Sequence, residues 1–288
     1  MTQEPENSVT PSELVARARE LATLPDVYFR TKTILEDPTS SHEDLADAIA
    51  SDPALAGRLL RMANSAFYGR PGSIATITRA VGLFGTQQVH DLVLATAIID
   101  SFKGFSSSLV HPREFWRSSL YAASAAKSLA EKCDILDSER LFVAGLLAQV
   151  GLLILYQELP SQMREILDAA GNQDFAAQQR KRIGFDYARI SAELFESWQL
   201  PAELVSPISG HTQPSAAAEN QLETAIIYIA TQLARAKVQG KTLENLIPLL
   251  DDGAWRITGL SVEGLEQLGN DARVLTEEIA PVLLYQAA

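Results

Sequence analysis

The sequence predicts an all-α protein, and three observations support that prediction. Apolar residues such as Leu55, Leu59 and Ala63 recur at three- and four-residue steps, which is the spacing of one helix face. Proline and glycine interrupt the chain at helix-length intervals, and no run of alternating apolar and polar residues is long enough to require a β-strand. The interrupting residues are Pro38, Pro53, Gly69, Pro71, Gly85, Pro112, Pro160, Gly184 and Pro201.

Two helix starts are marked by capping residues. Ser40 and Ser41 precede Glu43 and Asp44, the order expected of a capping box, in which a serine and an acidic side chain each bond the other's backbone N–H. Asp52 followed by Pro53 predicts the next start, because aspartate accepts from free N–H groups and proline fits the first turn.

The helix that starts at Pro53 is expected to end near Asn64. Asparagine adopts the left-handed backbone conformation more readily than most residues, so it suits a helix C-cap. The loop that follows, 64–72, contains Gly69, Pro71 and Gly72, which favour a turn over a continued helix.

The rest of the chain divides around a short polar stretch. Lys103 to Ser108 reads Lys-Gly-Phe-Ser-Ser-Ser, and Pro112 then starts a new helix. The apolar run from Leu141 to Tyr156 is expected to be one helix buried on all sides. The predicted parts are a flexible N-terminus at 1–13, an N-terminal helical bundle at 14–102, a linker at 103–111, a second helical domain at 112–237, and C-terminal helices at 238–288 that pack on the body.

Charge and composition exclude several classes of function. With 36 acidic and 24 basic residues the formal net charge is −12, which argues against nucleic-acid binding and against basic attachment to a membrane surface. The run Leu141 to Tyr156 is shorter than the roughly 20 residues that span a bilayer, so membrane insertion is not expected. The single cysteine, Cys133, and the polar segment from Met1 to Thr10 favour a cytoplasmic location.

Short segments follow one another in an order that resembles a known family. They read Asp-Pro-Ala-Leu at 52–55, Asn-Ser-Ala-Phe-Tyr-Gly at 64–69, Gly-Leu-Leu-Ala-Gln-Val-Gly at 145–151, Trp-Gln-Leu-Pro at 198–201 and Ile-Ser-Gly-His at 208–211. This series resembles the HDOD family, the HD-related output domain of bacterial signal-transduction proteins, over about 14–235. The resemblance implies an HD-domain or phosphodiesterase-like helical bundle that follows the N-terminal bundle.

The resemblance also implies that the metal site of the HD superfamily is lost. That superfamily has adjacent His and Asp metal ligands where this chain has Ala148 and Gln149, and the remaining ligand positions fall at Ser118, Tyr187, His211 and Thr231. A methyl group cannot bind a metal, a neutral carboxamide is a poor ligand for a hard cation, and a catalytic metal needs about three protein ligands. We therefore expect a vestigial cleft at these six positions, with no metal, no cofactor and no catalysis.

A second candidate site comes from the residues alone. Between Pro53 and His90 the chain has four arginines and no Asp or Glu. These arginines either pair with acids such as Glu43, Asp44 and Asp47, or form an electropositive surface that binds an acidic partner or a phosphorylated ligand. The residues of this arginine surface are Arg58, Arg61, Asn64, Arg70 and Arg79.

The function expected from these observations is a non-catalytic signalling or scaffold module that binds another signalling protein. Two alternatives stay open. One is a sensor that binds a nucleotide second messenger in the cleft or at the arginine surface, and the other is a residual HD-type phosphohydrolase. Metal analysis separates the phosphohydrolase from the other two, and a ligand thermal-shift screen separates the sensor from the scaffold.

Overall fold

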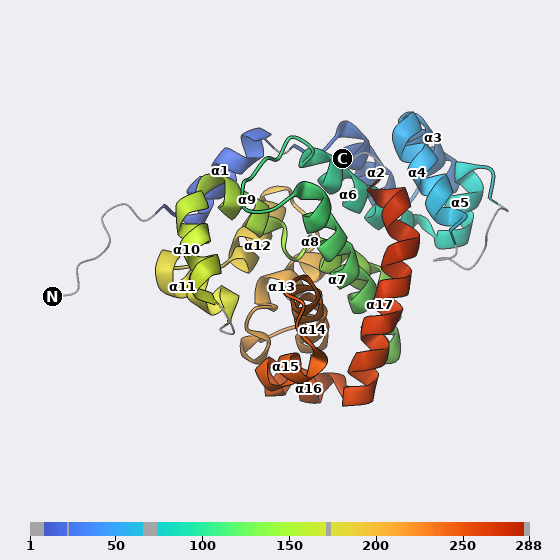
Figure 1. Cartoon of the computed structure of the whole chain (residues 1–288). Coiled ribbons are helices and arrows are strands. Elements are labelled where there is room, and N and C mark those ends of the chain that lie inside the picture. Colours follow the sequence, from blue (N-terminus) through green and yellow to red (C-terminus); the bar gives the residue numbers. More distant parts are fainter. Residues whose placement is uncertain (1–8, 22, 66–73, 171–173, 285–288) are drawn as a thin grey trace.

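The computed structural model describes residues 9–21, 23–65, 74–170 and 174–284, and the described part consists of helices joined by turns, without a strand (Figure 1). The predicted all-α class is confirmed. The helices are α1 (Pro11–Leu21), α2 (Asp26–Glu36), α3 (His42–Ala50), α4 (Pro53–Ala63), α5 (Ile77–Phe84), α6 (Thr86–Ser101), α7 (Pro112–Lys132), α8 (Ser138–Leu147), α9 (Val150–Glu158), α10 (Pro160–Ala170), α11 (Phe175–Ile183), α12 (Tyr187–Ser197), α13 (Ala202–Gly210), α14 (Gln221–Val238), α15 (Leu243–Leu246), α16 (Asp252–Thr258) and α17 (Val262–Leu283), with short 3-10 turns at Pro214–Ala216 and Ile247–Leu249.

The predicted capping residues start their helices as expected. Ser41 accepts from the backbone N–H of Asp44, and the Asp44 carboxylate accepts from the backbone N–H of Ser41, which completes the capping box of α3. Asp52 accepts from the N–H groups of Ala54 and Leu55 at the start of α4. These contacts are local in sequence, so the residue types alone were enough to predict them.

The centre of the molecule is the packing of α7 on α8, with α14 and α17 on the other sides of α7. A Cβ atom at Gly145 of α8 would lie 2.9 Å from Ala123 Cα and 3.0 Å from Ala122 O. Glycine therefore lets the α8 backbone approach the alanine-rich face of α7 closely. The side chains around this contact, including Ala126 and Leu147, are fully buried.

The apolar run expected as one helix is two helices. Helix α8 ends at Leu147 and α9 begins at Val150, with a turn at Ala148 and Gln149 between them. The region Ser138–Glu158 is long and apolar enough to cross a membrane, but 89% of its most apolar window is buried inside the protein. The expectation that it is a core segment is met, and the break lies at the two positions that correspond to the HD ligands.

Helix α1 packs differently from the predicted N-terminal bundle. It lies on α9 and α12, away from α3, α4 and α5 (Figure 1). Its buried face, Leu14, Val15 and Ala18, covers the second helical region, and Arg17 forms an ion pair with Glu158 at 3.4 Å. An amphipathic face shows that a helix is half-buried, but it does not show which neighbour covers it.

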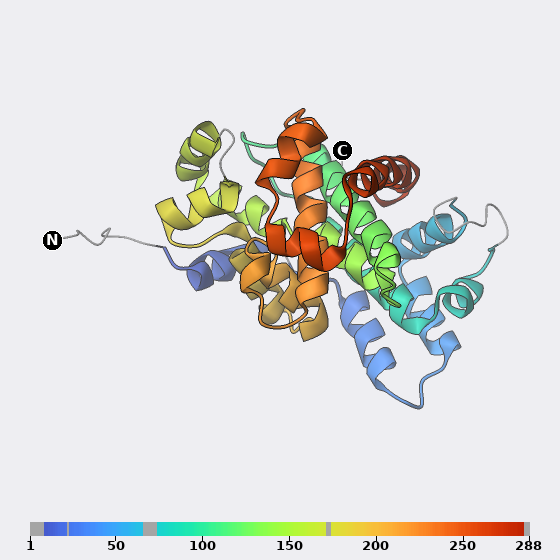
Figure 2. The same ribbon diagram turned by 90° about the horizontal axis from the view of Figure 1, so that it is seen from below.

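The segment at 103–111 and the C-terminal helices both contact the body. Phe105 is buried, within the stretch expected as a linker, although the stretch itself has no helix. Helix α17 lies beside α7 in both views of the molecule (Figures 1 and 2), where the Tyr121 hydroxyl donates to the carbonyl of Gly269 at 2.9 Å. The C-terminal helices thus pack on the body; the domain boundaries stay a prediction.

Candidate functional site

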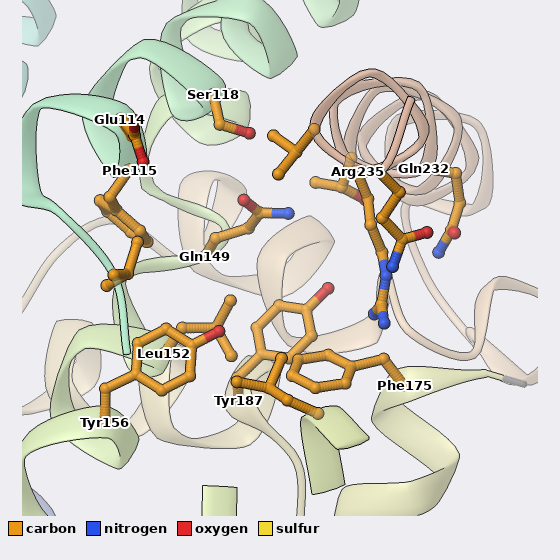
Figure 3. A pocket seen from close by; sticks show the side chains of 15 residues that line it. Glu114, Phe115, Ser118, Gln149, Leu152, Tyr156, Phe175, Tyr187, Gln232 and Arg235 are labelled. Carbon is orange, nitrogen blue, oxygen red and sulfur yellow. The ribbon is translucent and has the colours of Figure 1, made fainter. Parts of the chain in front are cut away.

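A cavity of about 250 Å³ lies where α7, α9, α11, α12 and α14 meet (Figure 3). Its wall is mostly apolar and aromatic, and its other polar side chains come from α7, from the turn before α9 and from one face of α14. The lining residues are Val110, Glu114, Phe115, Ser118, Gln149, Leu152, Tyr156, Leu167, Phe175, Tyr187, Thr231, Gln232, Arg235, Val238 and Gln239.

Four of the six residues predicted for the vestigial cleft line this cavity. Ser118, Gln149, Tyr187 and Thr231 come from four separate segments and meet around one space, as the resemblance implied. The other two residues are fully buried behind the wall and do not line it: Ala148 and His211.

His211 cannot act as a free metal ligand in this arrangement. Its Nδ1 lies 2.6 Å from the carbonyl of Ile208, which only accepts, so Nδ1 carries the proton. Its Nε2 then accepts from the Tyr187 hydroxyl at 3.0 Å. Burial lowers the pKa of His211, so the ring is neutral, and both ring nitrogens are used by the protein.

The donor groups at the cleft do not fit the metal of the HD superfamily. Within the described ranges, no three His, Cys, Asp or Glu side chains gather closely enough to hold a metal ion. Thr231 donates its hydroxyl to the carbonyl of Tyr228 at 2.9 Å, and Gln149 offers only a neutral carboxamide. Among the described lining residues the only carboxylate is Glu114, and one carboxylate falls short of the roughly three protein ligands that a catalytic metal needs, so no chemical step is assigned to a metal here.

Arg235 is a functional candidate that the sequence did not reveal. It lies in the last turn of α14, and its guanidinium carbon is 4.0 Å from the centre of the Phe175 ring (Figure 3). Burial lowers its pKa from the ordinary value, but a guanidinium stays protonated in proteins. Arginine is common at helix C-termini, so the sequence gives no sign of a special role for Arg235. Only the position of α14 beside the cavity identifies it as a candidate.

The tyrosines of the cavity wall are neutral phenols. Burial raises the pKa of Tyr156 to about 12, and it raises the pKa of Tyr187 as well. Neither phenol supplies a negative charge near neutral pH. The acidic and basic side chains of the wall are Arg235 and the exposed Glu114, which lies on the opposite side of the cavity in Figure 3.

The arginine surface is not assembled as expected. Arg58 is buried and forms a two-pronged ion pair with Asp100 of α6, with Nη1 2.9 Å from Oδ1. Its partner is thus none of the acids on α3, and Arg58 offers no exposed charge. Arg61 and Arg79 are exposed on α4 and α5, while Arg70 lies outside the described residues. A binding role for Arg61, Arg70 and Arg79 stays a prediction.

Asn64 ends α4 as predicted, but not in the left-handed region, since its φ is −99°. Its side-chain amide donates to the carbonyls of Leu60 and Ile74 at 2.8 and 2.7 Å, and its Oδ1 accepts from the backbone N–H of Ile74 at 2.9 Å. The residue therefore joins the C-terminus of α4 to the backbone of Ile74. Both the nitrogen and the oxygen of the Asn64 carboxamide take part in these hydrogen bonds.

A family model for the HDOD domain matches residues 21–214. The chain belongs to the HDOD domain family. An uncharacterised protein of Treponema pallidum is 24% identical over 205 residues, which cover 69% of this chain but only 39% of that protein. The chain thus spans well under half the length of this curated relative.

Solved structures show the same fold. An HDOD domain protein of unknown function from Geobacter sulfurreducens superposes with a TM-score of 0.73 at 23% identity, covering 95% of this chain and 99% of that one. A candidate phosphohydrolase from Shewanella amazonensis gives 0.70 at 23% identity, covering 93% and 98%. A candidate signal-transduction protein from Marinobacter aquaeolei gives 0.65 at 20% identity, covering 96% and 67%. At these identities the likeness concerns the fold.

Proposed function

We propose that this protein is a non-catalytic HDOD signalling module that acts by binding, with the former catalytic cleft kept as a pocket. The observation that carries the proposal is that the residues at the HD ligand positions are either bonded within the protein or lack a group that binds a metal. His211, which alone keeps the identity of an HD ligand, has both ring nitrogens bonded to Tyr187 and Ile208. The positions next to it offer hydroxyl, methyl and carboxamide groups, which cannot hold and activate a metal-bound water.

Membership of the HDOD family and the likeness to a candidate signal-transduction protein support a role in signalling. Such a module needs an input and an output. The cavity offers a place for a small-molecule input, and another signalling protein is the partner we propose for the output. A sensor role is favoured over a pure scaffold by one observation, the charged Arg235 that faces the cavity.

The test of the non-catalytic role measures metal content and hydrolysis together. Purified protein should hold no stoichiometric divalent metal, and it should hydrolyse neither p-nitrophenyl phosphate nor bis-p-nitrophenyl phosphate with added Mg²⁺ or Mn²⁺. The double variant Ala148→His with Gln149→Asp should stay inactive, because Ser118, Tyr187 and Thr231 still supply no ligand.

A bound metal together with turnover in the unmodified protein would replace this proposal with the residual phosphohydrolase. A Tyr187→Phe variant gives a matched check of the explanation. It removes the hydroxyl bonded to His211 Nε2 without adding a ligand, so it should not create metal binding either.

A further inference from the structure

Among the described residues, Arg235 differs from the other buried and half-buried arginines in forming no ion pair with an acidic side chain. Arg58 pairs with Asp100, Arg180 pairs with Asp186, and Arg140 lies 3.7 Å from Glu223. Within the described ranges, no ion pair or hydrogen bond joins the Arg235 guanidinium to another residue, although the negative charge of Asp174 acts on it from farther away. A partly buried guanidinium without a partner is costly, and an anion offsets that cost.

A second polar group faces the same space without a partner. The Gln149 side chain lines the cavity from the turn between α8 and α9, and its carboxamide makes no hydrogen bond to a described residue. Figure 3 shows this side chain pointing from the turn toward the α14 side of the cavity, where Arg235 and Gln232 lie. A carboxamide can donate to an anion and accept from a neighbouring group at once.

The six residues at the ligand positions are neutral side chains, so they bring no negative charge to the cleft. An acidic residue at position 149 would neutralise Arg235 and attract a cation, whereas Gln149 keeps the space neutral apart from the guanidinium. Glu114 is exposed on the far side of the cavity and disfavours a second negative charge there. With one guanidinium in the wall, Glu114 across the cavity and Asp174 near Arg235, the charges favour a ligand with a single acidic group.

The remaining wall indicates the body of that ligand. Four aromatic rings line the cavity, from Phe115, Tyr156, Phe175 and Tyr187, and an aromatic wall favours a flat ring. The volume of about 250 Å³ is below the roughly 300 to 1,000 Å³ that holds drug-sized molecules. This size fits one ring with an acidic group and excludes the enclosure of a dinucleotide.

We infer that the cavity binds a small ring-bearing anion, a carboxylate or a phosphate monoester, whose acidic group contacts Arg235 and Gln149. The inference rests on the proposed function, because it assumes that the cleft serves binding. The charge-assisted contact to Arg235 supplies selectivity for the anion, and the aromatic wall supplies affinity for the ring.

The experiment uses the full chain and three probes that share a phenyl ring: benzoate, phenyl phosphate and neutral benzamide. Each probe is titrated by calorimetry to about 10 mM, which reaches the weak affinities expected of such small molecules. At least one of the two anions should bind about tenfold or more tightly than benzamide. The stronger of the two anions then identifies the acidic group as carboxylate or phosphate.

Two variants of the wall should change this preference in a defined way. Arg235→Gln should remove the preference for the anion and leave benzamide binding within about threefold. Gln149→Glu has nearly the same shape, and its added negative charge should weaken the anion about tenfold without weakening benzamide. Arg256→Gln removes the same charge at an exposed site outside this cavity, so it should bind both probes as the unmodified protein does.

Equal affinity for anions and benzamide, or no saturable binding of either anion to the folded protein, would overturn the inference. So would an equal loss in Arg256→Gln and Arg235→Gln. If Arg235→Gln does not fold, Gln149→Glu decides by itself. Release of phenol from phenyl phosphate would instead overturn the proposed function, while the benzoate series would still decide the role of Arg235.

Discussion

His90 and Asp91 are neighbours on α6, and burial shifts the pKa values of both toward their neutral forms. Burial raises the pKa of Asp91 to about 7, although Gln87 donates to its Oδ1 at 3.0 Å. Burial, with a smaller effect of Lys32, lowers the pKa of His90 to about 4. The ordinary pKa is about 3.9 for aspartate and about 6.5 for histidine, so the two pKa shifts are opposite in direction and similar in size.

The effects of these two shifts on the pH dependence of the free energy of unfolding largely cancel between about pH 4 and pH 6.5. In that range the folded protein holds a proton on Asp91 and none on His90, whereas the unfolded chain holds one on the histidine and none on the aspartate. Because both states bind one proton, the pair gives the free energy of unfolding no slope with pH. Above that range the folded protein loses the Asp91 proton near pH 7, so stability falls as the pH rises toward 7 and then levels off.

Asp91→Asn should separate the two effects. The asparagine Oδ1 can still accept from Gln87, and the ionisation is removed. A shift of about three pKa units at about 1.4 kcal/mol each sets an upper limit near 4 kcal/mol for the stabilisation at pH 8. In the variant the histidine acts alone, so stability should decline as the pH falls from 6.5 to 4, by up to about 1.4 kcal/mol per pH unit.

Urea unfolding followed by circular dichroism at pH 4.5, 6 and 8 measures both effects, with the exposed Asp168→Asn on α10 as the control. Most substitutions destabilise, so a large gain at pH 8 is diagnostic. A variant that is less stable than the unmodified protein at pH 8, or that shows no new decline below pH 6.5, would show that the pKa of Asp91 is not raised in the folded protein and that this reasoning is wrong.

Two further substitutions test the packing. Gly151→Ala places a Cβ in steric clash with the Tyr187 carbonyl oxygen, so it should push α9 away from α12 and lower the free energy of unfolding by about 3 kcal/mol. Its control is Gly82→Ala, whose Cβ meets no atom within 4 Å and should change the free energy of unfolding little. Arg58→Met leaves Asp100 with only the Lys103 ammonium, at 3.0 Å, and should lower the free energy of unfolding by about 2 kcal/mol. Its control, Arg79→Met at an exposed site, should lower it by less than about 0.5 kcal/mol. Thermal and urea unfolding of the four variants measures both differences, and equal effects within either pair would contradict the packing described.

The parts of the fold that were predictable from the sequence are those set by neighbouring residues. The capping box at Ser41, the Asp52 cap and the class of the fold all follow from contacts within one or two turns. The division of the apolar run into α8 and α9 was not predictable, because neither Ala148 nor Gln149 breaks a helix. The contact of Gly151 with the backbone of Tyr187 and Ser191, which belong to another helix, fixes where α9 lies.

The pairing of arginines shows a second limit. Four arginines without nearby acids in sequence looked like one surface, yet Arg58 reaches Asp100, 42 positions away, across the packed helices α4 and α6. Long side chains pair with whatever carboxylate the fold brings near them, so the local sequence does not report their partners. A charge pattern along the chain is therefore weaker evidence of a surface than a capping pattern is of a helix.

The candidate site combines both limits. The resemblance to the HDOD family located four wall residues correctly, because a family motif records which positions meet in space. It described them only by the ligands they lack, and it was silent on Arg235 of α14, which is not one of the motif positions. The properties of the cavity are set by the residues that line it. These include one guanidinium without an ion pair and four aromatic side chains, and the proposed binding of an anion rests on them.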